Sequence, residues 1–262
     1  MGGEIGEQDF QRLLLLLCGE EGATAPYEFV PGRCGGVSFT ALADRRRLIE
    51  QNLLEDAAGI WKLTATGRTA AAKVSGKVRL AMDRLAREQN GRRGEALLHE
   101  VNRRHPDFFA APQRGEPGLC TIGYEGSSLE GYLNRLLRAG VTLLCDVRRN
   151  PLSRKYGFSK GTLAKSCDEV GIRYEHLPEL GIASEERREL KTQADYDAIF
   201  AVYEREHLPK QGAALARIRG WVAEGQRVAL TCFEADPCEC HRHCVAEALE
   251  REFGGCFAPR HL

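Results

Sequence analysis

The chain has 262 residues, and its 37 Lys and Arg are balanced by 37 Asp and Glu. This length allows one large domain or two ordinary ones, and the balanced charge indicates neither a nucleic acid nor an anionic membrane, so any basic surface must be local. There is no run of about 20 apolar residues, and the leucines at 13–17 follow acidic residues. We therefore expect a soluble, cytoplasmic protein with no membrane partner, whose ten cysteines are mostly reduced.

Residues 1–75 predict a small DNA-binding domain of the winged helix-turn-helix type. A helix-compatible apolar run covers 10–17, Ser38 can cap a helix that extends to about Leu54, and residues 59–64 have the pattern of a short strand after a turn. Helix, loop, basic helix and small hairpin form the layout of a winged helix. The candidate DNA contacts are Arg45, Arg46, Arg47 and Lys62. The alternative is that the arginines form a solvated helix face.

Residues 76–118 predict a basic helical linker. Arginines recur between Arg79 and Arg104, and a cluster of Pro and Gly from Pro112 to Gly118 indicates a domain boundary. The arginines could follow the phosphates of a nucleic acid. A linker helix exposed on most faces would be equally polar, and we favour the linker.

From residue 119 to 262, short apolar runs alternate with helical patterns. This rhythm predicts an α/β domain with a mostly parallel sheet that is flanked by helices. Strands are expected at 119–122, 141–147, 172–177 and 228–233. Helices are expected at 129–138, 163–170, 196–207, 213–224 and 245–253.

Polar residues follow the strands of this predicted sheet, where ligands bind in open parallel sheets. Asp146 and Arg148 are two residues apart, as are Cys232 and Glu234, so each pair should share one face of its strand. Residues 123–126, Gly-Tyr-Glu-Gly, form a flexible loop that lets the backbone approach a ligand. We expect a single polar site that comprises Asp146, Arg148, Cys232, Glu234, Cys240, His241 and Arg242.

A helix start is predicted at Asp236. Asp236 can serve as the cap, Pro237 occupies the first helical position, and Glu239 follows three residues after the cap. Residues 240–242, Cys-His-Arg, would then lie in the first two turns, close to free backbone N–H groups. Such a position favours a phosphate, a thiolate or both.

Three interpretations of the cysteines and histidines remain open. In the first, Cys232 and Cys244 are small buried residues, and Arg242 pairs with a carboxylate. The second is a metal site. Its potential ligands are Cys232, Cys238, Cys240, His241, His243 and Cys244. Because paired C-x-x-C knuckles are missing, the spacing does not favour a metal.

The third interpretation is covalent or acid/base catalysis. Cys240 or Cys232 would be the nucleophile, His241 and Glu234 would carry protons, and two arginines would bind an oxyanion.

Several short motifs occur in order between residues 119 and 250. They are Thr121-Ile122-Gly123-Tyr124-Glu125, Asp146-Val147-Arg148, Pro151, Ser153, Phe158, Tyr174, Leu180-Gly181, Cys232, Glu234 and Cys240-His241-Arg242. This series resembles the domain of unknown function 488 family, and the N-terminal part is similar to a winged-helix-like extension that some members carry. The resemblance implies the α/β fold and a functional core at these positions, but no reaction. Cys238, His243 and Cys244 lie outside the family pattern, which weakens a metal site that needs them.

We therefore expect a DNA-binding protein with a C-terminal enzymatic domain of hydrolase or lyase type. It would act on nucleic acid or a nucleotide-like phosphate compound by base excision, cleavage or modification, as in DNA repair. The expected catalytic residues are Asp146, Glu234, Cys232, Cys240 and His241. The expected substrate contacts are Tyr124, Arg148, Ser153, Lys155 and Arg242. The cofactor and the oligomeric state are not determined by the sequence.

Two alternatives to an enzyme follow from the same residues. One is a DNA-binding regulator that senses a metal, an oxidant or a small anion through the Cys and His cluster. The other is a binding module in which the polar cluster is a structural ion-pair network.

Overall fold

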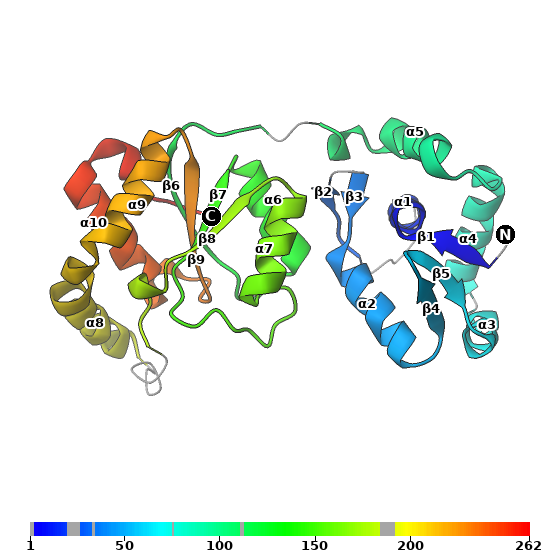
Figure 1. Ribbon diagram of the computed structural model, residues 1–262, viewed down its shortest axis with the longest axis horizontal. Coiled ribbons are helices and arrows are strands. Elements are labelled where there is room, and N and C mark those ends of the chain that lie inside the picture. Colours follow the sequence, from blue (N-terminus) through cyan, green and yellow to red (C-terminus); the bar gives the residue numbers. More distant parts are fainter. Residues whose placement is uncertain (1–2, 20–26, 33–34, 75, 111–112, 184–191) are drawn as a thin grey trace. The chain divides into compact units, whose positions relative to one another are not determined.

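The chain consists of two compact units, residues 1–111 and 112–262. A computed structural model describes residues 3–19, 27–32, 35–74, 76–110, 113–183 and 192–262 (Figure 1). None of the helices in these ranges has the length and hydrophobicity that crossing a bilayer requires.

The N-terminal unit combines two small antiparallel sheets with five helices in its described residues. The three-stranded sheet has the order β1-β5-β4, and β2 and β3 form a separate pair. The strands are β1 (Glu4–Gly6), β2 (Val30–Gly32), β3 (Gly35–Val37), β4 (Leu54–Ala57) and β5 (Ile60–Leu63). The helices are α1 (Glu7–Cys18), α2 (Phe39–Glu50), α3 (Ala65–Ala72), α4 (Gly76–Gln89) and α5 (Gly94–Arg104).

Local signals account for α2 and the hairpin that follows it. The Ser38 side chain accepts a hydrogen bond from the backbone N–H of Ala41, as expected for an N-cap. The helix ends at Glu50, earlier than predicted, because the chain turns at Asn52 with a positive φ of 55° before β4 begins. The β2-β3 pair lies in a region expected to be a loop, and the start of that loop at Pro26 lies outside the described residues.

The two arginine-rich helices α4 and α5 belong to the N-terminal core. Leu85 of α4 and Leu97 and Val101 of α5 are buried together with Leu15 and Leu16 of α1. Much of the segment expected to be a linker therefore packs within this unit. On each helix the apolar residues form a narrow stripe among many charged residues. The sequence pattern therefore did not predict that these helices pack in a core. The boundary itself, including the predicted Pro112, falls outside the described residues.

The C-terminal unit has the α/β fold that the sequence predicts. Its five strands have the order β10-β6-β9-β7-β8, and all neighbouring strands are parallel. The strands are β6 (Gly118–Gly123), β7 (Leu143–Asp146), β8 (Arg173–His176), β9 (Arg227–Cys232) and β10 (Arg260–His261). Four of them coincide with the predicted apolar runs. β10 was not predicted, because its two polar residues lie exposed at the edge of the sheet.

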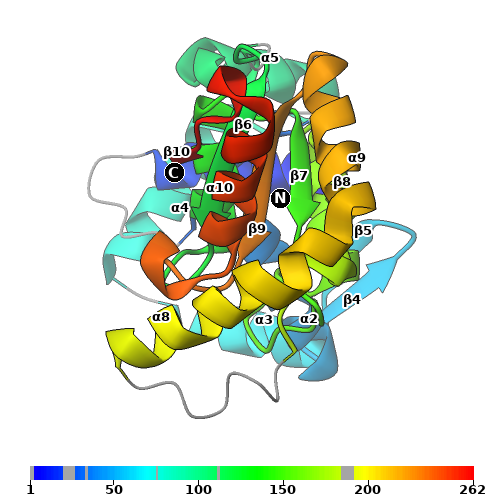
Figure 2. The same ribbon diagram turned by 90° about the vertical axis from the view of Figure 1, so that its left-hand side faces the viewer.

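Helices cover both faces of this sheet (Figure 1). One face carries α6 (Leu129–Arg138) and α7 (Lys160–Glu169), and the other carries α9 (Gly212–Ala223) and α10 (Arg242–Phe253), seen in front of the strands in Figure 2. Helix α8 (Gln193–Val202) continues into a π turn, Tyr203–His207. Short 3-10 turns lie at Pro106–Phe108, Pro178–Leu180, Leu208–Gln211, Pro237–Glu239 and Gly255–Phe257.

Alternation along β7 decides which side chains meet which helix layer. Leu143, Cys145 and Val147 join the apolar cluster that includes the buried residues of α9 and α10. Leu144 and Asp146 must then point to the face covered by α6 and α7, because neighbouring strand residues point to opposite faces. The sheet thus separates residues that are close in the chain.

Candidate functional site

Asp146, the last residue of β7, is fully buried and bound on both of its carboxylate oxygens. Arg148 donates from Nε to Oδ1 at 2.8 Å and from Nη2 to Oδ2 at 2.5 Å. The Tyr174 hydroxyl also donates to Oδ2, at 2.6 Å. Burial, followed by the charge of Asp146, raises the pKa of Tyr174. Both carboxylate oxygens of Asp146 are therefore occupied by donors from neighbouring side chains.

Arg148 is held as firmly as its partner. Its Nη1 donates to the Tyr124 hydroxyl at 2.8 Å and to the Phe158 carbonyl at 2.9 Å. Burial opposes the charge of this guanidinium, but its hydrogen bond with Asp146 and the charge of that residue outweigh burial and raise the pKa of Arg148. The Tyr124 ring stacks on Phe158 with a centroid distance of 4.3 Å. Tyr124 and Arg148, expected to contact substrate, thus belong to a packed network.

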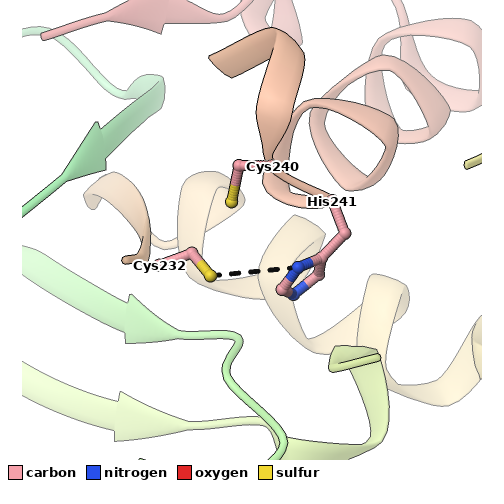
Figure 3. A group of neighbouring side chains, drawn as sticks. All are labelled: Cys232, Cys240 and His241. Atoms are coloured by element: carbon pink, nitrogen blue, oxygen red, sulfur yellow. Dashed lines mark hydrogen bonds between the residues drawn. The ribbon is translucent and has the colours of Figure 1, made fainter. Parts of the chain in front are cut away.

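Cys232, the last residue of β9, lies in the apolar cluster on the opposite face of the sheet. Its Sγ donates to Oε2 of Glu234 at 3.3 Å and lies 3.8 Å from Nδ1 of His241. Cys240 completes the group: the two sulfurs and a ring nitrogen of His241 lie within 4.8 Å of one another. Figure 3 shows the three side chains pointing toward a common point. We call Cys232, Cys240 and His241 the thiol cluster.

The orientation of His241 is determined by the backbone. Its Nε2 lies 3.1 Å from the carbonyl oxygen of Val147. Because a carbonyl only accepts hydrogen bonds, Nε2 carries a proton, and in the neutral ring Nδ1 presents a lone pair to the Cys232 sulfur. Val147 is itself fixed, since its N–H donates to the carbonyl of Thr231 at 3.2 Å.

Cys240 and His241 do not lie within a continuous helix that starts at Asp236. The Asp236 side chain does accept from the N–H of Cys238, but only a 3-10 turn, Pro237–Glu239, follows. Cys240 is then extended, with φ of −137° and ψ of 127°, and α10 begins at Arg242. Across this break, Nδ1 of His243 lies within hydrogen-bond distance of the carbonyls of Pro237 and Cys240. Burial raises the pKa of Cys240 well above its ordinary value.

Arg242, expected to bind phosphate, holds the segment that carries Glu234. Nη1 donates to the carbonyl of Glu234 at 2.6 Å and Nη2 to that of Ala235 at 2.8 Å. The side chain is 1% exposed. Gly123 makes room for the same segment, since a Cβ at this position would lie 1.8 Å from the Glu234 carbonyl oxygen. The sequence predicted that glycine would allow a ligand to approach, whereas here it allows a neighbouring backbone to approach.

A pocket of about 440 Å³ opens where the strands end. It is lined by Tyr124, Arg148, Asn150, Leu152, Ser153, Arg154, Lys155, Tyr196, Cys232, Phe233 and Glu234. Cys232, which is fully buried, and the partly exposed Glu234 therefore contribute to the pocket wall, beside the basic loop 148–155. Arg148 is the member of the buried ion pair that reaches it.

The pocket loop is ordered by its own hydrogen bonds. Ser153 accepts from the N–H of Lys155 at 3.2 Å and is linked to the Ser159 hydroxyl through its backbone. Lys155 Nζ donates to the Tyr124 carbonyl at 2.8 Å, and burial lowers the pKa of this amine. Ser153 and Lys155 thus shape the wall of the pocket.

Residues 128–249 match a protein-family model, described as Domain of unknown function DUF488. Over these residues the C-terminal unit is similar to the DUF488 family, and we refer to the matching region as the DUF488 domain. The match covers Asp146, Arg148 and the whole thiol cluster, and it confirms the resemblance that the motif series indicated for this unit. Comparison with curated proteins and with solved structures finds no match.

Further residues of the DUF488 domain were not expected at the site. Phe233, 42% exposed, and Arg154, also exposed, line the pocket together with Tyr196. The sequence offered a signal for two of them. Phe233 lies between Cys232 and Glu234 at the strand end, and Arg154 lies between Ser153 and Lys155, which were expected to contact substrate. Among the described residues, Cys238, His243 and Cys244 are not part of the thiol cluster.

Outside the DUF488 domain, most of the expected DNA-binding cations form ion pairs. Arg45 pairs with Glu7 at 2.8 Å and with Asp56 at 3.2 Å, and its guanidinium lies over the Trp61 ring. The other two pairs are Lys62 with Glu4 at 2.7 Å and Arg47 with Asp44 at 3.3 Å. Arg46 is exposed and makes no ion pair with another described residue.

Proposed function

We propose that the DUF488 domain is an enzyme that acts on nucleic acid or a nucleotide-like phosphate compound in the pocket at the strand ends. One observation carries the proposal: Cys232 lines the pocket, and its sulfur lies 3.3 Å from the Glu234 carboxylate and 3.8 Å from Nδ1 of His241. A thiol with two proton acceptors, beside a cavity, has the arrangement of a reactive centre.

The proposal assigns distinct roles to these side chains. Glu234 is partly exposed and lines the pocket, so its carboxylate can exchange a proton with a bound substrate. The sulfur of Cys232 is reactive as a thiolate, which is the form that acts as nucleophile or as metal ligand. His241 presents Nδ1 to this sulfur while Nε2 stays bonded to Val147, so the ring holds the sulfur and Glu234 is the proton carrier.

The rest of the pocket wall supports a nucleotide as the substrate class. Arg154 and Lys155 supply positive charge for a phosphate, which the paired Arg148 alone does not. Phe233 exposes an aromatic ring at the same wall, and such a ring provides a stacking surface for a base. Positive charge next to an aromatic surface matches the two chemically different parts of a nucleotide.

Asp146 has a different role in this proposal from the catalytic one expected. Its oxygens are bound by Arg148 and Tyr174, and its side chain points to the face opposite the thiol cluster. We assign it to the framework of the pocket: it positions Arg148, which reaches the pocket wall.

DNA binding by the N-terminal unit is part of the same proposal. The order of α2 and the β4-β5 hairpin supports a winged-helix arrangement. Arg46 is the cation best placed to contact a phosphate, since the other three are engaged in ion pairs.

Product formation from labelled single-stranded and double-stranded DNA and from free nucleotides tests the proposal. Cys232→Ala should lower the rate by about 100-fold or more, because a reacting group is removed. The matched control is Cys167→Ala, which removes a buried thiol from α7 on the other layer and should leave the rate unchanged.

Equal rates for the wild type and Cys232→Ala would refute the catalytic assignment. If instead DNA affinity depends on thiol oxidation or on metal while no substrate is converted, the protein is a regulator and the enzymatic proposal is wrong.

A further inference from the structure

We infer that the thiol cluster binds one thiophilic divalent metal ion, for which zinc is the best fit, with an open coordination position toward the pocket. The three ligand atoms are the sulfurs of Cys232 and Cys240 and Nδ1 of His241, brought together from the end of β9 and the segment before α10. Two thiolates and one imidazole are a donor set that selects zinc over magnesium or calcium.

The distances match such a site. Zinc–sulfur bonds of about 2.3 Å and zinc–nitrogen bonds of about 2.0–2.1 Å in a tetrahedron place a sulfur and a nitrogen roughly 3.5 Å apart, and two sulfurs roughly 3.8 Å apart. Cys232 Sγ and His241 Nδ1 are 3.8 Å apart, and all three ligand atoms lie within 4.8 Å of one another. A small inward rotation of the side chains would complete the coordination.

The surroundings of His241 provide an independent indication. Histidines that bind metal through one ring nitrogen usually donate the other N–H to a carbonyl or carboxylate, which fixes the ring. His241 does this: Nε2 bonds Val147 and Nδ1 is directed at the sulfur of Cys232. This ring is also 1% exposed, so the lone pair on Nδ1 has no access to bulk water.

The extended conformation of Cys240 explains how neighbours in the chain can bind the same ion. Within an α-helix, consecutive side chains diverge by about 100°. The break between the Pro237–Glu239 turn and α10 instead lets Cys240 and His241 face one point (Figure 3).

The fourth coordination position is left to water or substrate. Among the described residues, no further cysteine, histidine or carboxylate joins the three ligands, and three protein ligands with one open position are typical of catalytic zinc. Cys232 and Glu234 both line the pocket, so the open position faces it. Glu234 lies beside the ligand sulfur without belonging to the cluster, as a proton carrier next to a metal-bound water should.

The resulting reaction is hydrolysis, and this part rests on the proposed function. An ion held by Cys232, Cys240 and His241 would activate a water molecule; Glu234 would take one proton from that water, whose oxygen would form a bond to the electrophilic phosphorus or carbon of the nucleotide. The bond to the leaving group breaks with its electron pair, and the leaving group takes the proton from Glu234. No oxidant or reductant is needed.

Elemental analysis of the full chain, purified without chelators, tests the metal site directly. We expect about one zinc ion per chain in the wild type and loss of that zinc in Cys240→Ala. Cys238→Ser, which changes an exposed cysteine outside the cluster, is the matched control and should keep the zinc.

Cobalt replacement keeps the test decisive if Cys240→Ala does not fold. Wild-type protein loaded with Co²⁺ should show thiolate-to-cobalt charge-transfer absorption. Substoichiometric zinc together with no such band in reduced protein would overturn the inference, as would a Cys232–Cys240 disulfide in the purified chain. If the protein binds zinc but converts no substrate, the proposed function is refuted and the metal site is retained. If turnover is unaffected by metal removal, the metal site is refuted and the proposed function is retained.

Discussion

Two polar clusters end neighbouring strands of the same sheet, and they differ in the partners that surround their side chains. In the first, both oxygens of Asp146 are bound by Arg148 and Tyr174 in a buried ion pair. In the second, two sulfurs and an imidazole nitrogen lie within 4.8 Å of one another, and Cys232 also lines a pocket. A position at a strand end is therefore insufficient to identify a reacting group. The informative property is which chemical groups the fold brings together beside a cavity.

The largest expected effect comes from breaking the first cluster. Asp146→Ala should lower the free energy of unfolding by about 3–5 kcal/mol, because the buried Arg148 guanidinium loses its counter-charge. Urea denaturation followed by circular dichroism measures this. In a double-mutant cycle with Arg148→Met, the combined loss should be smaller than the sum of the single losses. A loss below about 1 kcal/mol for Asp146→Ala would show that the pair is not a structural anchor.

A smaller but complementary effect is expected in the second cluster. Glu234→Gln should slow turnover by about 100-fold, equivalent to about 2.7 kcal/mol, because the proton carrier is removed while the shape is kept. Its free energy of unfolding should change by less than about 1 kcal/mol. Steady-state kinetics and the same denaturation experiment separate the two quantities. If Glu234→Gln chiefly destabilises the protein and Asp146→Asn chiefly slows turnover, the assignment of the two clusters must be exchanged.

The smallest expected effect concerns the N-terminal unit, whose cations differ in whether they form an ion pair. Arg46→Ala should weaken DNA binding by a few-fold and reduce the magnitude of the salt slope by about 1, as expected for loss of one phosphate contact. Lys62→Ala, which removes a cation paired with Glu4, should have less effect. Fluorescence anisotropy at several salt concentrations provides both values. Equal losses for the two variants would contradict the idea that ion pairing separates these cations.

Much of the C-terminal fold could be predicted because its strands are buried on both faces and its helices are amphipathic. Helix α6 is an example: Leu129, Leu133 and Leu136 recur at helical spacing, and Ser128 caps the helix by accepting from the N–H of Gly131. The predicted bounds of this helix coincide with the observed ones. In α4 and α5 the stripe of apolar residues is narrow, so the sequence shows a weaker contrast between an apolar and a polar face.

The division of the polar residues between two faces could not be predicted, because it depends on register. Asp146 of β7 is opposite Thr231 of β9, so Cys232 lies one residue further along and points to the other face. Alternation within one strand is visible in the sequence. The offset between strands that are far apart in the chain is set by packing, and so the expected single site became two clusters that meet only at the pocket.

The spacing of the cysteines did not indicate which of them lie together. The sequence lacks paired C-x-x-C knuckles, and a metal was not favoured for that reason. An extended residue between a 3-10 turn and a helix allows the adjacent Cys240 and His241 to face the same point. Backbone conformation at one residue thus brings together groups that the spacing did not pair.

Gly123 gives the pocket an unexpected sensitivity to variation. A methyl group at this position would collide with the carbonyl of Glu234, and the Arg242 guanidinium leaves that segment little freedom to retreat. We therefore expect a change from glycine to alanine to displace the Glu234 backbone and, with it, the carboxylate of a residue that lines the pocket. In a survey of natural or laboratory variants, we expect substitutions of Gly123 to be tolerated as poorly as substitutions of a catalytic residue, because the contact of Gly123 is with the protein backbone at Glu234.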